Sequence, residues 1–368
     1  MFFDVTVIGA GTIGISIAHL LSKKNYKVLL IDKEKNFGLH TSSRNTEIIH
    51  AGIYYKPNSL KAKMCIEGKS LLYNFCDYYK VPYKKCGKIF LGYNNDHLKN
   101  FESIISRAEL NGLNDLYEIS SEKISSIEPN IKGKYFLRSP SSGIFDSQDF
   151  MQKMLNIAVD NDLIFSPNTE LNFVEDYKTY NTLHVIENKK NRFKINSKII
   201  INCAGNFSIS LFEKIFDIKT LYKPNPIKGN YLTYSGKALF ENIIYPPLKP
   251  GKIEPRIDAI SDMNNIMKFG PDVEQVTSLE DYTVNENIKT KFYNEISKYL
   301  KNIEIDKLNL AYSGIRPKIK YKNFLHDDFV IEWYKDKCIN LFGMDSPALT
   351  SSLAIAKYVN SMIDEKNK

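Results

Sequence analysis

The sequence predicts a protein of the α/β class, because a strand, a glycine turn and a helix follow one another three times along the chain. These units begin at about residues 3, 198 and 338. They are most simply interpreted as one discontinuous nucleotide-binding domain. A second, sheet-containing domain would then be inserted into it twice.

The first unit carries the spacing G-x-G-x-x-G at Gly9, Gly11 and Gly14. Gly9 allows the tight turn after the strand, Gly11 lets a pyrophosphate approach the backbone, and Gly14 lets the helix pack close to the strand. A second strand over residues 28–31 ends on Asp32, where a carboxylate can accept a hydrogen bond from a ribose 2′-hydroxyl. These features predict a Rossmann-like dinucleotide site. The acid argues against the 2′-phosphate of NADP and leaves NAD and FAD open.

The composition is that of a folded globular protein, with 368 residues, enough for two domains, and a hydrophobic content of 43%. The five cysteines form no C-x-x-C pair, and their odd number without a secretory signal favours reduced thiols in a cytosolic compartment. The histidines show no H-x-x-H spacing, so we expect no metal site. No apolar run reaches the ~18 residues that a membrane helix needs.

The net charge of +8 comes mostly from scattered lysines. Solvated lysine-rich faces explain it most simply, and the alternatives are attraction of an anionic substrate or contact with an acidic membrane surface. Basic and aromatic residues do not interleave as they would in a nucleic-acid groove. We therefore expect a cytoplasmic protein, free or peripheral at the inner face of a membrane, with no nucleic-acid partner.

Several longer segments carry a family resemblance. Residues 38–55 read GLHTSSRNTEIIHAGIYY, and residues 341–352 read LFGMDSPALTSS. Both resemble the D-amino-acid oxidase superfamily of FAD-dependent enzymes, and within it the L-2-hydroxyglutarate dehydrogenases and oxidases. Shorter segments resemble the same family in the same order, so that the resemblance spans nearly the whole chain. The shorter segments are residues 86–88, 141–144, 228–231, 269–274 and 312–318.

The resemblance implies a Rossmann-like FAD-binding domain of the glutathione-reductase type and a discontinuous α+β substrate domain with a mixed or antiparallel sheet. Together with the pattern of elements, the resemblance divides the chain into two domains. The FAD-binding domain is expected to comprise residues 1–80, 142–220 and 311–368. The substrate-binding domain is expected to comprise residues 81–141 and 221–310.

The resemblance also implies oxidation of a C–H bond beside a hydroxyl or amine, by hydride transfer to flavin N5. The leading interpretation is oxidation of a small anionic 2-hydroxy acid, with L-2-hydroxyglutarate converted to 2-oxoglutarate. Another oxidoreductase of the superfamily, acting on an amino acid, an N-methyl amino acid or glycerol 3-phosphate, is the nearest alternative. An RNA- or partner-binding flavoprotein and a plain NAD dehydrogenase are further ones. The electron acceptor is left open among oxygen, a quinone and a carrier protein.

For the reaction, His50 is the expected base, because imidazole titrates near neutral pH. A histidine that only hydrogen-bonds the flavin or the backbone is an equally good interpretation. Arg316 is expected to hold a carboxylate through its planar guanidinium. Lys228 is expected to meet a second carboxylate or the flavin edge, and Tyr55 is a candidate for the pocket wall.

One departure from the family concerns the substrate. Where the family usually carries a histidine-containing strand, residues 253–261 of this chain contain no histidine. Arg256, a third cation, is a candidate to replace it. If that strand helps to select the substrate, the chain can prefer a related acid.

The cofactor is expected to contact three groups of residues. Residues 346–350 precede a helix whose N-terminus can stabilise negative charge near the flavin ring. Residues 41–44 are expected to cover the pyrophosphate and ring, and Ala204 with Gly205 the adenosine side. The full expected set is Gly9, Gly11, Gly14, Asp32, Lys33, Thr41, Ser42, Ser43, Arg44, Leu171, Ala204, Gly205, Gly343, Ser346, Pro347, Ala348, Leu349 and Thr350.

Overall fold

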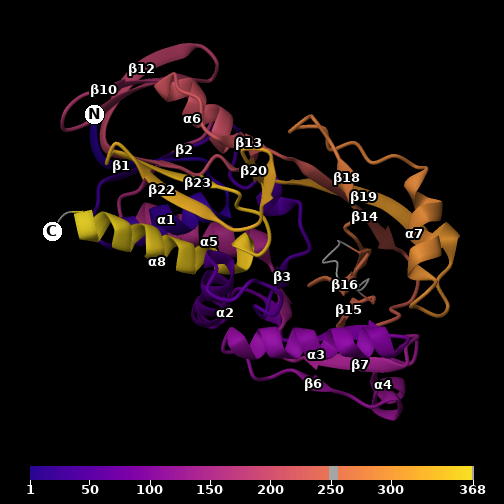
Figure 1. The fold of residues 1–368 in the computed structure, drawn as a ribbon. Helices are drawn as coiled ribbons and strands as arrows, with labels where there is room; N and C mark the ends of the chain where they lie inside the picture. The colour runs from indigo at the N-terminus through magenta and orange to yellow at the C-terminus, as the bar shows by residue number, and fades with distance from the viewer. Residues whose placement is uncertain (248–255, 367–368) are drawn as a thin grey trace.

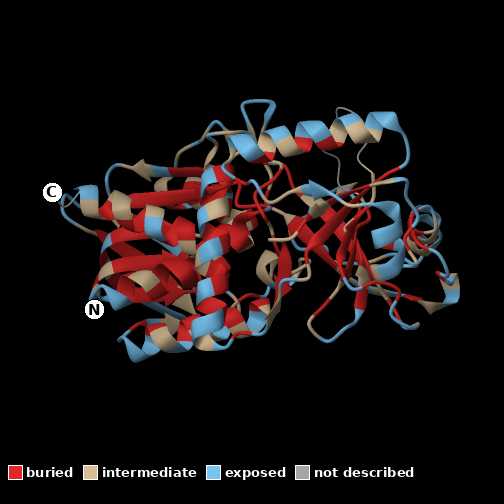
Figure 2. Cartoon of the chain, turned by 90° about the horizontal axis from the view of Figure 1, so that it is seen from below, coloured by how far each residue is buried: buried red, intermediate tan, exposed pale blue. Residues whose placement is uncertain are grey.

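Two large β-sheets organise the computed structural model, which describes residues 1–247 and 256–366. In Figure 1, helices α1, α5 and α8 lie on the first sheet, whereas α3, α4 and α7 lie with the second. The strands of both sheets are mostly buried, and the helices turn exposed faces to solvent (Figure 2). Each sheet therefore has its own core.

The first sheet brings together the strands of the three predicted units. β1 (Phe2–Ile8) pairs in parallel with β2 (Val28–Ile31) and with β12 (Asn191–Asn202). β2 continues to β9 (Ile164–Ser166), and β12 pairs in parallel with β23 (Cys338–Phe342). Strands from the start, middle and end of the chain thus lie side by side, which confirms the predicted α/β class.

Antiparallel strands extend this sheet beyond β12 and β23, whereas β9 forms the opposite edge, and helices cover the sheet. The added strands are β10 (Thr169–Asp176), β11 (Asn181–Glu187) and β22 (Val330–Tyr334). The helices on this side are α1 (Thr12–Lys23), α2 (Leu60–Tyr79), α5 (Ser147–Asp160), α6 (Ser208–Phe216) and α8 (Ala348–Lys366). The apolar faces of α1, α2, α5 and α8 meet the sheet in one cluster, as helical spacing requires, and α6 packs into two other clusters.

The second sheet is mixed, because β15 pairs in parallel with β5 while the other strand pairs of the sheet are antiparallel. Its strands are β5 (Lys88–Gly92), β6 (Tyr117–Glu118), β7 (Tyr135–Ser139), β14 (Ile227–Tyr234), β15 (Ile243–Tyr245), β16 (Ala259–Ser261), β17 (Met267–Phe269), β18 (Glu274–Gln275) and β19 (Leu308–Arg316). The helices beside it are α3 (Asn95–Leu110), α4 (Ser121–Ile127) and α7 (Ile288–Ile296).

Two small sheets lie between the large ones. The first joins β3 (Ile48–Ile49), β8 (Gly143–Phe145) and β4 (Tyr83–Lys84). The second joins β13 (Tyr222–Pro224), β20 (Ile319–Tyr321) and β21 (Phe324–His326). Each contains strands from both sides of a predicted domain boundary, so the two halves are tied together by backbone hydrogen bonds.

One predicted boundary needs correction. Residue 311 lies inside β19, which pairs with β14 from Leu308 to Arg316. The strand is a single ladder, interrupted only by one register shift near Tyr231, so all of it belongs to the second sheet. The first domain therefore resumes after Arg316. Within the strand, Ser313 and Gly314 are a turn signal in the sequence, but the ladder continues through both residues.

Helices α2 and α8 pack closely at Gly68. A Cβ on Gly68 would lie 2.5 Å from the carbonyl oxygen of Thr350 and 2.7 Å from the Cα of Ser351. Both neighbours are backbone atoms of α8, so neither can rotate away. The first turn of α8 can therefore lie this close to α2 only because Gly68 has no side chain.

We predict that Gly68→Ala lowers the Tm. In a helix without this contact, alanine would stabilise by about 1 kcal/mol relative to glycine. Overpacking against the α8 backbone should instead destabilise by about 1–3 kcal/mol. Scanning calorimetry of Gly68→Ala beside Ser70→Ala, on the exposed face of α2, measures the difference. A Tm equal to or above that of the wild type would show that the helices can move apart freely.

Candidate active site

A cavity of about 1410 Å³ lies between the two halves of the molecule. Gly9 and Asp32, at the carboxyl ends of β1 and β2, line it from the first sheet. Ile227 and Tyr231 of β14 and Ile315 of β19 line it from the second. Ligands of open α/β sheets bind outside the carboxyl ends of the strands, and small-molecule sites favour domain interfaces.

The glycine turn has the close packing that its spacing predicts. Gly9 has a φ of +105°, and a Cβ there would lie 2.5 Å from the carbonyl oxygen of Cys203. A Cβ on Gly14 would lie 1.9 Å from the carbonyl oxygen of Gly9. The tight turn and the close approach of helix to strand are therefore confirmed.

The N-terminus of α1 opens onto the cavity without a side-chain cap. Its N-cap is Gly11, which lines the cavity, and a Cβ added to it would lie 3.0 Å from Ser42 Oγ. The amide of Thr12 donates to the same hydroxyl at 2.9 Å. The first amides of a helix have no partner within it, and they favour a phosphate. The turn fits a pyrophosphate.

Asp32 is held in a fixed orientation at the cavity wall. Its Oδ2 accepts from the amide of Ala10 at 2.6 Å, and its Oδ1 accepts from the amide of Glu34 at 2.8 Å. Burial raises the pKa of this carboxyl above its ordinary value, although both amides act to lower it. Each oxygen retains a lone pair for a further donor such as a ribose hydroxyl.

Most of the predicted cofactor contacts lie on this cavity. Those lining it are Gly9, Gly11, Asp32, Lys33, Thr41, Ser42, Arg44, Leu171, Ala204, Gly205, Ser346, Pro347, Ala348 and Leu349. The Nε atom of Arg44 is buried and has no hydrogen-bond partner among the described residues. That any of these residues touches a cofactor stays a prediction.

Four predicted cofactor contacts do not line the cavity, so their roles need correction. Gly14 lies beneath the turn, and Ser43 is exposed and donates from its hydroxyl to the carbonyl of His40. Gly343 turns the chain with a φ of +70°, against Ile319. Thr350 is fully buried. These four residues support the walls of the cavity without lining it.

His50 lies where α8 begins. Its amide donates to Thr350 Oγ1 at 3.0 Å, and its Nε2 lies 3.2 Å from Ser346 Oγ. Burial lowers the pKa of the imidazole well below its ordinary 6.5, and the charge of Lys88 lowers it further. A neutral imidazole with one nitrogen at the cavity wall can accept a proton. Tyr55 lines the same region.

Arg316 is a cation of the site without a carboxylate partner among the described residues. It ends β19 and lines the cavity, and its Nη1 is buried without a hydrogen-bond partner among the described residues. No described carboxylate forms an ion pair with it. A buried guanidinium nitrogen without a partner is unfavourable, so an anion that binds here gains a strong interaction.

The structure does not bring Lys228 into the cavity. Adjacent strand residues face opposite sides of a sheet, and Ile227 lines the cavity, so Lys228 lies on the other side of β14. Its ammonium lies 3.9 Å from Glu274 and 3.8 Å from Asp281. The prediction that it meets the substrate is wrong in its geometry, because strand alternation overrides nearness in sequence.

Arg256 lies on the cavity as the sequence predicts, but it is already paired. Its Nε donates to Asp258 at 2.9 Å, its Nη2 donates to the hydroxyl of Tyr54 at 3.0 Å, and its guanidinium lies 4.1 Å from the ring centre of Tyr245. Burial raises the pKa of Asp258 to about 6, although Arg256 and Lys88 lower it. Residues 253–255 of the stretch without histidine lie outside the described residues.

Sequence reasoning missed Lys88. Its ammonium lies 3.8 Å from the ring centre of Tyr245, and burial lowers its pKa to about 7. Residues 86–88 belong to the family resemblance, but nothing in their spacing indicates that this lysine is buried behind the site. Asp258 was also missed, and here a signal exists: positions two apart on an extended chain share a face, so it accompanies Arg256.

A third missed group lies near the start of α8. Asp345 is buried, 2.6 Å from the ammonium of Lys61 and 2.9 Å from that of Lys318. Burial would raise the pKa of Asp345, but the two lysines lower it below its ordinary value. All three residues line the cavity, and they connect α2, α8 and the chain after β19. The predicted segment 346–350 is therefore fixed by ion pairs that precede it.

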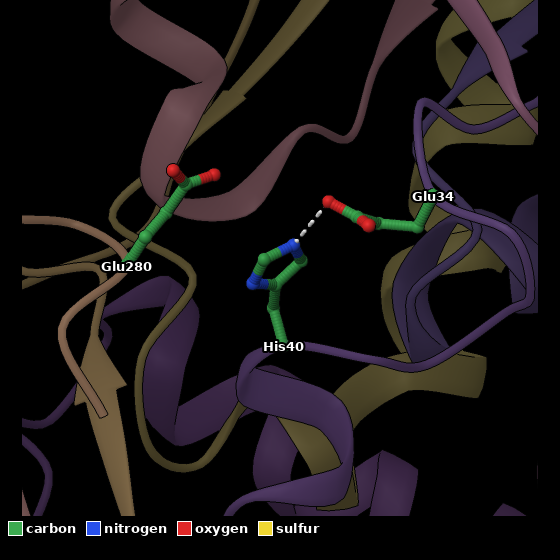
Figure 3. A group of neighbouring side chains, drawn as sticks. All are labelled: Glu34, His40 and Glu280. Atoms are coloured by element: carbon green, nitrogen blue, oxygen red, sulfur yellow. Dashed lines mark hydrogen bonds and ion pairs between the residues drawn. The ribbon is translucent and has the colours of Figure 1, made fainter. Parts of the chain in front are cut away.

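Glu34, His40 and Glu280 gather near the outer part of the cavity (Figure 3). His40 Nε2 lies 2.9 Å from Glu34, and Nδ1 lies 2.8 Å from the hydroxyl of Tyr282. The ammonium of Lys33 is 2.7 Å from Glu280 and 3.7 Å from Glu34. This cation offsets part of the negative charge of the two carboxylates, and the group joins the loop after β2 to the segment after β18.

The family described as FAD dependent oxidoreductase matches residues 4–362. This chain belongs to that family. The predicted membership in the D-amino-acid oxidase superfamily is confirmed, and the chain is an FAD-dependent oxidoreductase. The glycine turn, the uncapped start of α1 and the fixed carboxylate of Asp32 fit this cofactor.

Individual relatives extend the comparison. An L-2-hydroxyglutarate dehydrogenase of Arabidopsis thaliana, named mitochondrial, is 33% identical over 97% of this chain and 82% of its own length. A glycerol 3-phosphate dehydrogenase of Caloramator mitchellensis is 31% identical over 97% of this chain and 73% of its own length. The L-alpha-glycerophosphate oxidase structure of Mycoplasma pneumoniae, with FAD bound, has a TM-score of 0.88 at 22% identity, covering 99% of this chain and 95% of that one.

We predict that Gly11→Val abolishes FAD retention. A branched side chain at this position would collide with Ser42 and fill the space before the first amides of α1. Absorbance of the purified variant near the flavin band measures retained cofactor. Ser43→Ala is the control, because Ser43 does not line the cavity, and it should stay fully loaded. A fully loaded Gly11→Val protein would contradict the assignment of this turn to the pyrophosphate.

Proposed function

We propose that this FAD-dependent oxidoreductase oxidises a small anionic 2-hydroxy acid, with L-2-hydroxyglutarate as substrate and 2-oxoglutarate as product. The observation that carries the proposal is Arg316, a half-buried residue on the cavity wall whose buried Nη1 lacks a partner among the described residues. An anionic substrate would supply that partner. Several relatives, including the one at 33% identity, are named L-2-hydroxyglutarate dehydrogenases, which supports this choice.

A second cation favours a substrate with two anionic groups. Arg256 lines the same cavity, and Lys88 is buried behind Tyr245. Asp258 offsets part of this charge, so the site prefers one strong anion at Arg316 and a second, more weakly held one at Arg256. A dicarboxylate meets both demands. Glycerol 3-phosphate, with one anionic group, is the second candidate, on the relative at 31% identity.

The chain's own residues would bind the acid and receive its hydroxyl proton. FAD, when bound, accepts the hydride from the carbon that carries the hydroxyl. Arg316 would hold the adjacent carboxylate through two parallel hydrogen bonds and so fix the direction of that C–H bond. His50, kept neutral by burial, would accept the hydroxyl proton at Nε2. The negative charge of the bound acid would favour the imidazolium that results.

We also place the activity in the cytoplasm. All five cysteines are free thiols in the described structure, which suits a reducing compartment. Oxygen, a quinone and a carrier protein stand as candidate electron acceptors. No helix among the described residues is both long and apolar enough to cross a membrane.

An anaerobic titration with L-2-hydroxyglutarate tests the proposed reaction. We expect the flavin absorbance near 450 nm to bleach as the acid is added, because hydride transfer reduces the ring. Glycerol 3-phosphate, glycine and proline serve as parallel titrants. Bleaching by one of these and not by the 2-hydroxy acid would replace the proposed substrate, and a bound flavin that no acid bleaches would contradict the reaction.

We predict that Arg316→Lys weakens substrate binding and leaves FAD bound. The lysine keeps the charge but loses the second hydrogen bond of the fork. A hydrogen bond to a charged group contributes about 1.5–3 kcal/mol, so the KM should rise about 10- to 150-fold. Steady-state kinetics with the loaded enzyme measure this change. Arg192→Lys, on the exposed part of β12, is the control, and an equal KM in both variants would remove Arg316 from the site.

We predict that His50→Ala slows flavin reduction by about 10²- to 10⁴-fold, the range of a lost general base. Stopped-flow absorbance under anaerobic conditions measures the rate constant at saturating acid. His184→Ala serves as the control, since His184 pairs with Glu175 outside the cavity and should keep the wild-type rate. A near-wild-type rate in His50→Ala would reduce this residue to a packing and hydrogen-bonding role.

A further inference from the structure

The segment between β18 and α7 reaches from the second half of the molecule to the loop that follows β2. Glu280, Asp281 and Tyr282 follow one another in this irregular segment, and each of them contacts a cation. Two of these cations, Lys33 and Arg44, line the cavity. We call the three consecutive residues the clasp.

The two acids of the clasp each form an ion pair. The carboxylate of Glu280 lies 2.7 Å from the ammonium of Lys33, and the same ammonium lies 3.8 Å from the ring centre of Phe207. The carboxylate of Asp281 lies 3.8 Å from the ammonium of Lys228, which is buried. The clasp is thus joined to the loop after β2 at one residue and to β14 at the next.

Tyr282 makes the central contacts of the clasp. Its hydroxyl lies 2.8 Å from Nδ1 of His40, and its carbonyl accepts from Ser313 Oγ at 2.8 Å. Its ring centre lies 4.1 Å from the guanidinium carbon of Arg44. A guanidinium held over a tyrosine ring is a cation–π contact, which restricts the position of the charged group.

Arg44 is held on several sides but retains free donors. Its backbone carbonyl oxygen packs on Gly314, where an added Cβ would lie 2.1 Å from it, and its Nη1 donates to the carbonyl of Ser313 at 3.3 Å. Its Nε is buried and has no hydrogen-bond partner among the described residues. A guanidinium offers five N–H donors, and a phosphate can accept two of them in parallel. The fixed guanidinium of Arg44 on the cavity wall therefore suits the pyrophosphate of FAD.

A continuous series of contacts connects this clasp with Asp32. The carboxylate of Asp32 accepts from the amide of Glu34, and the carboxylate of Glu34 lies 2.9 Å from Nε2 of His40. Because an ionised carboxylate can only accept, Nε2 donates to Glu34, and Nδ1 of the neutral ring then accepts from the hydroxyl of Tyr282. Figure 3 shows Glu34 and His40 joined in this way, with Glu280 on another segment of the chain. The residues expected at the ribose and at the pyrophosphate thus share one support.

We propose that Tyr282 is a positioning residue for FAD, which holds the guanidinium of Arg44 for the pyrophosphate. The only regular element within residues 33–44, all of which the structure describes, is the short η1 (Thr41–Ser43), so contacts with other segments must hold this loop. FAD that leaves the cavity breaks its contacts with the loop, and a loop released from the clasp makes this easier. The clasp therefore sets how fast FAD dissociates. This inference rests on the cofactor of the family and is independent of the proposed substrate.

The rate of FAD dissociation from the loaded protein tests the role of Tyr282, with released flavin measured by its fluorescence after dilution. Tyr282→Phe keeps the ring over Arg44 and loses the hydroxyl, so the rate should rise about 2- to 12-fold. Tyr282→Leu also loses the cation–π contact, which should add a further factor of about 2 to 30. Tyr177→Leu, at an exposed position that does not line the cavity, is the control and should keep the wild-type rate.

A double variant tests whether Tyr282 acts through Arg44. Arg44→Met removes the cation, so in this background Tyr282→Leu should raise the rate no more than Tyr282→Phe does in the wild type. A wild-type rate in Tyr282→Leu would overturn the proposal. Equal rates in the Phe and Leu variants, or an undiminished effect of Tyr282→Leu beside Arg44→Met, would also overturn it, because the ring contact would then contribute nothing.

The ion pair of the clasp provides a second measurement that does not disturb any packed ring. Glu280→Gln, at a side chain that is 57% exposed, should speed FAD dissociation at low salt and change it little at high salt, because salt screens exposed pairs. Glu286→Gln changes the net charge equally at an exposed position of the same segment and should have no effect. Equal rates in these two variants at low salt would contradict the control of FAD release by the clasp.

Discussion

The close approach of α1 to β1 is the constraint on which the rest of the site depends. No side chain fits at Gly14, because its Cβ would meet the carbonyl oxygen of Gly9, and none fits at Gly9, because its Cβ would meet Cys203. This packing turns the uncapped end of α1 toward the carboxyl edge of the first sheet. It also holds the turn against the end of β12, so the start and middle of the chain form one wall of the cavity.

The opposite wall depends on the second sheet and on α8. β14 lines the cavity with Ile227 and Tyr231 but not with Lys228, and β19 ends at the cavity with Arg316. Helix α8 begins beside His50, and its start is held by the buried carboxylate of Asp345 between two lysines. The reacting region is thus supported by backbone ladders and ion pairs rather than by a mobile loop, as orientation of a small acid requires.

Charge is distributed unevenly over the molecule, and the cations of the cavity and of the surface differ in how far they are paired with acids. At Arg316 the buried Nη1 of a half-buried guanidinium lacks a partner among the described residues, whereas at Arg256 the carboxylate of Asp258 offsets the charge. The two cations therefore differ in their attraction for an anion, although both line one cavity. On the surface, Lys223, Lys320 and Lys322 lie close together around the β20–β21 hairpin and form no ion pair with a described residue, so part of the net charge of +8 is concentrated there.

The sequence by itself determined the α/β class, the dinucleotide turn and the family. These are local properties: glycine spacing, the position of Asp32 and long segments of resemblance do not require knowledge of distant contacts. Only the tertiary structure decided which side of β14 faces the cavity, that β19 stays in the second sheet through Arg316, and that Lys88 is buried behind Tyr245. Strand register and burial arise from pairing between distant segments, and no single stretch of sequence encodes them.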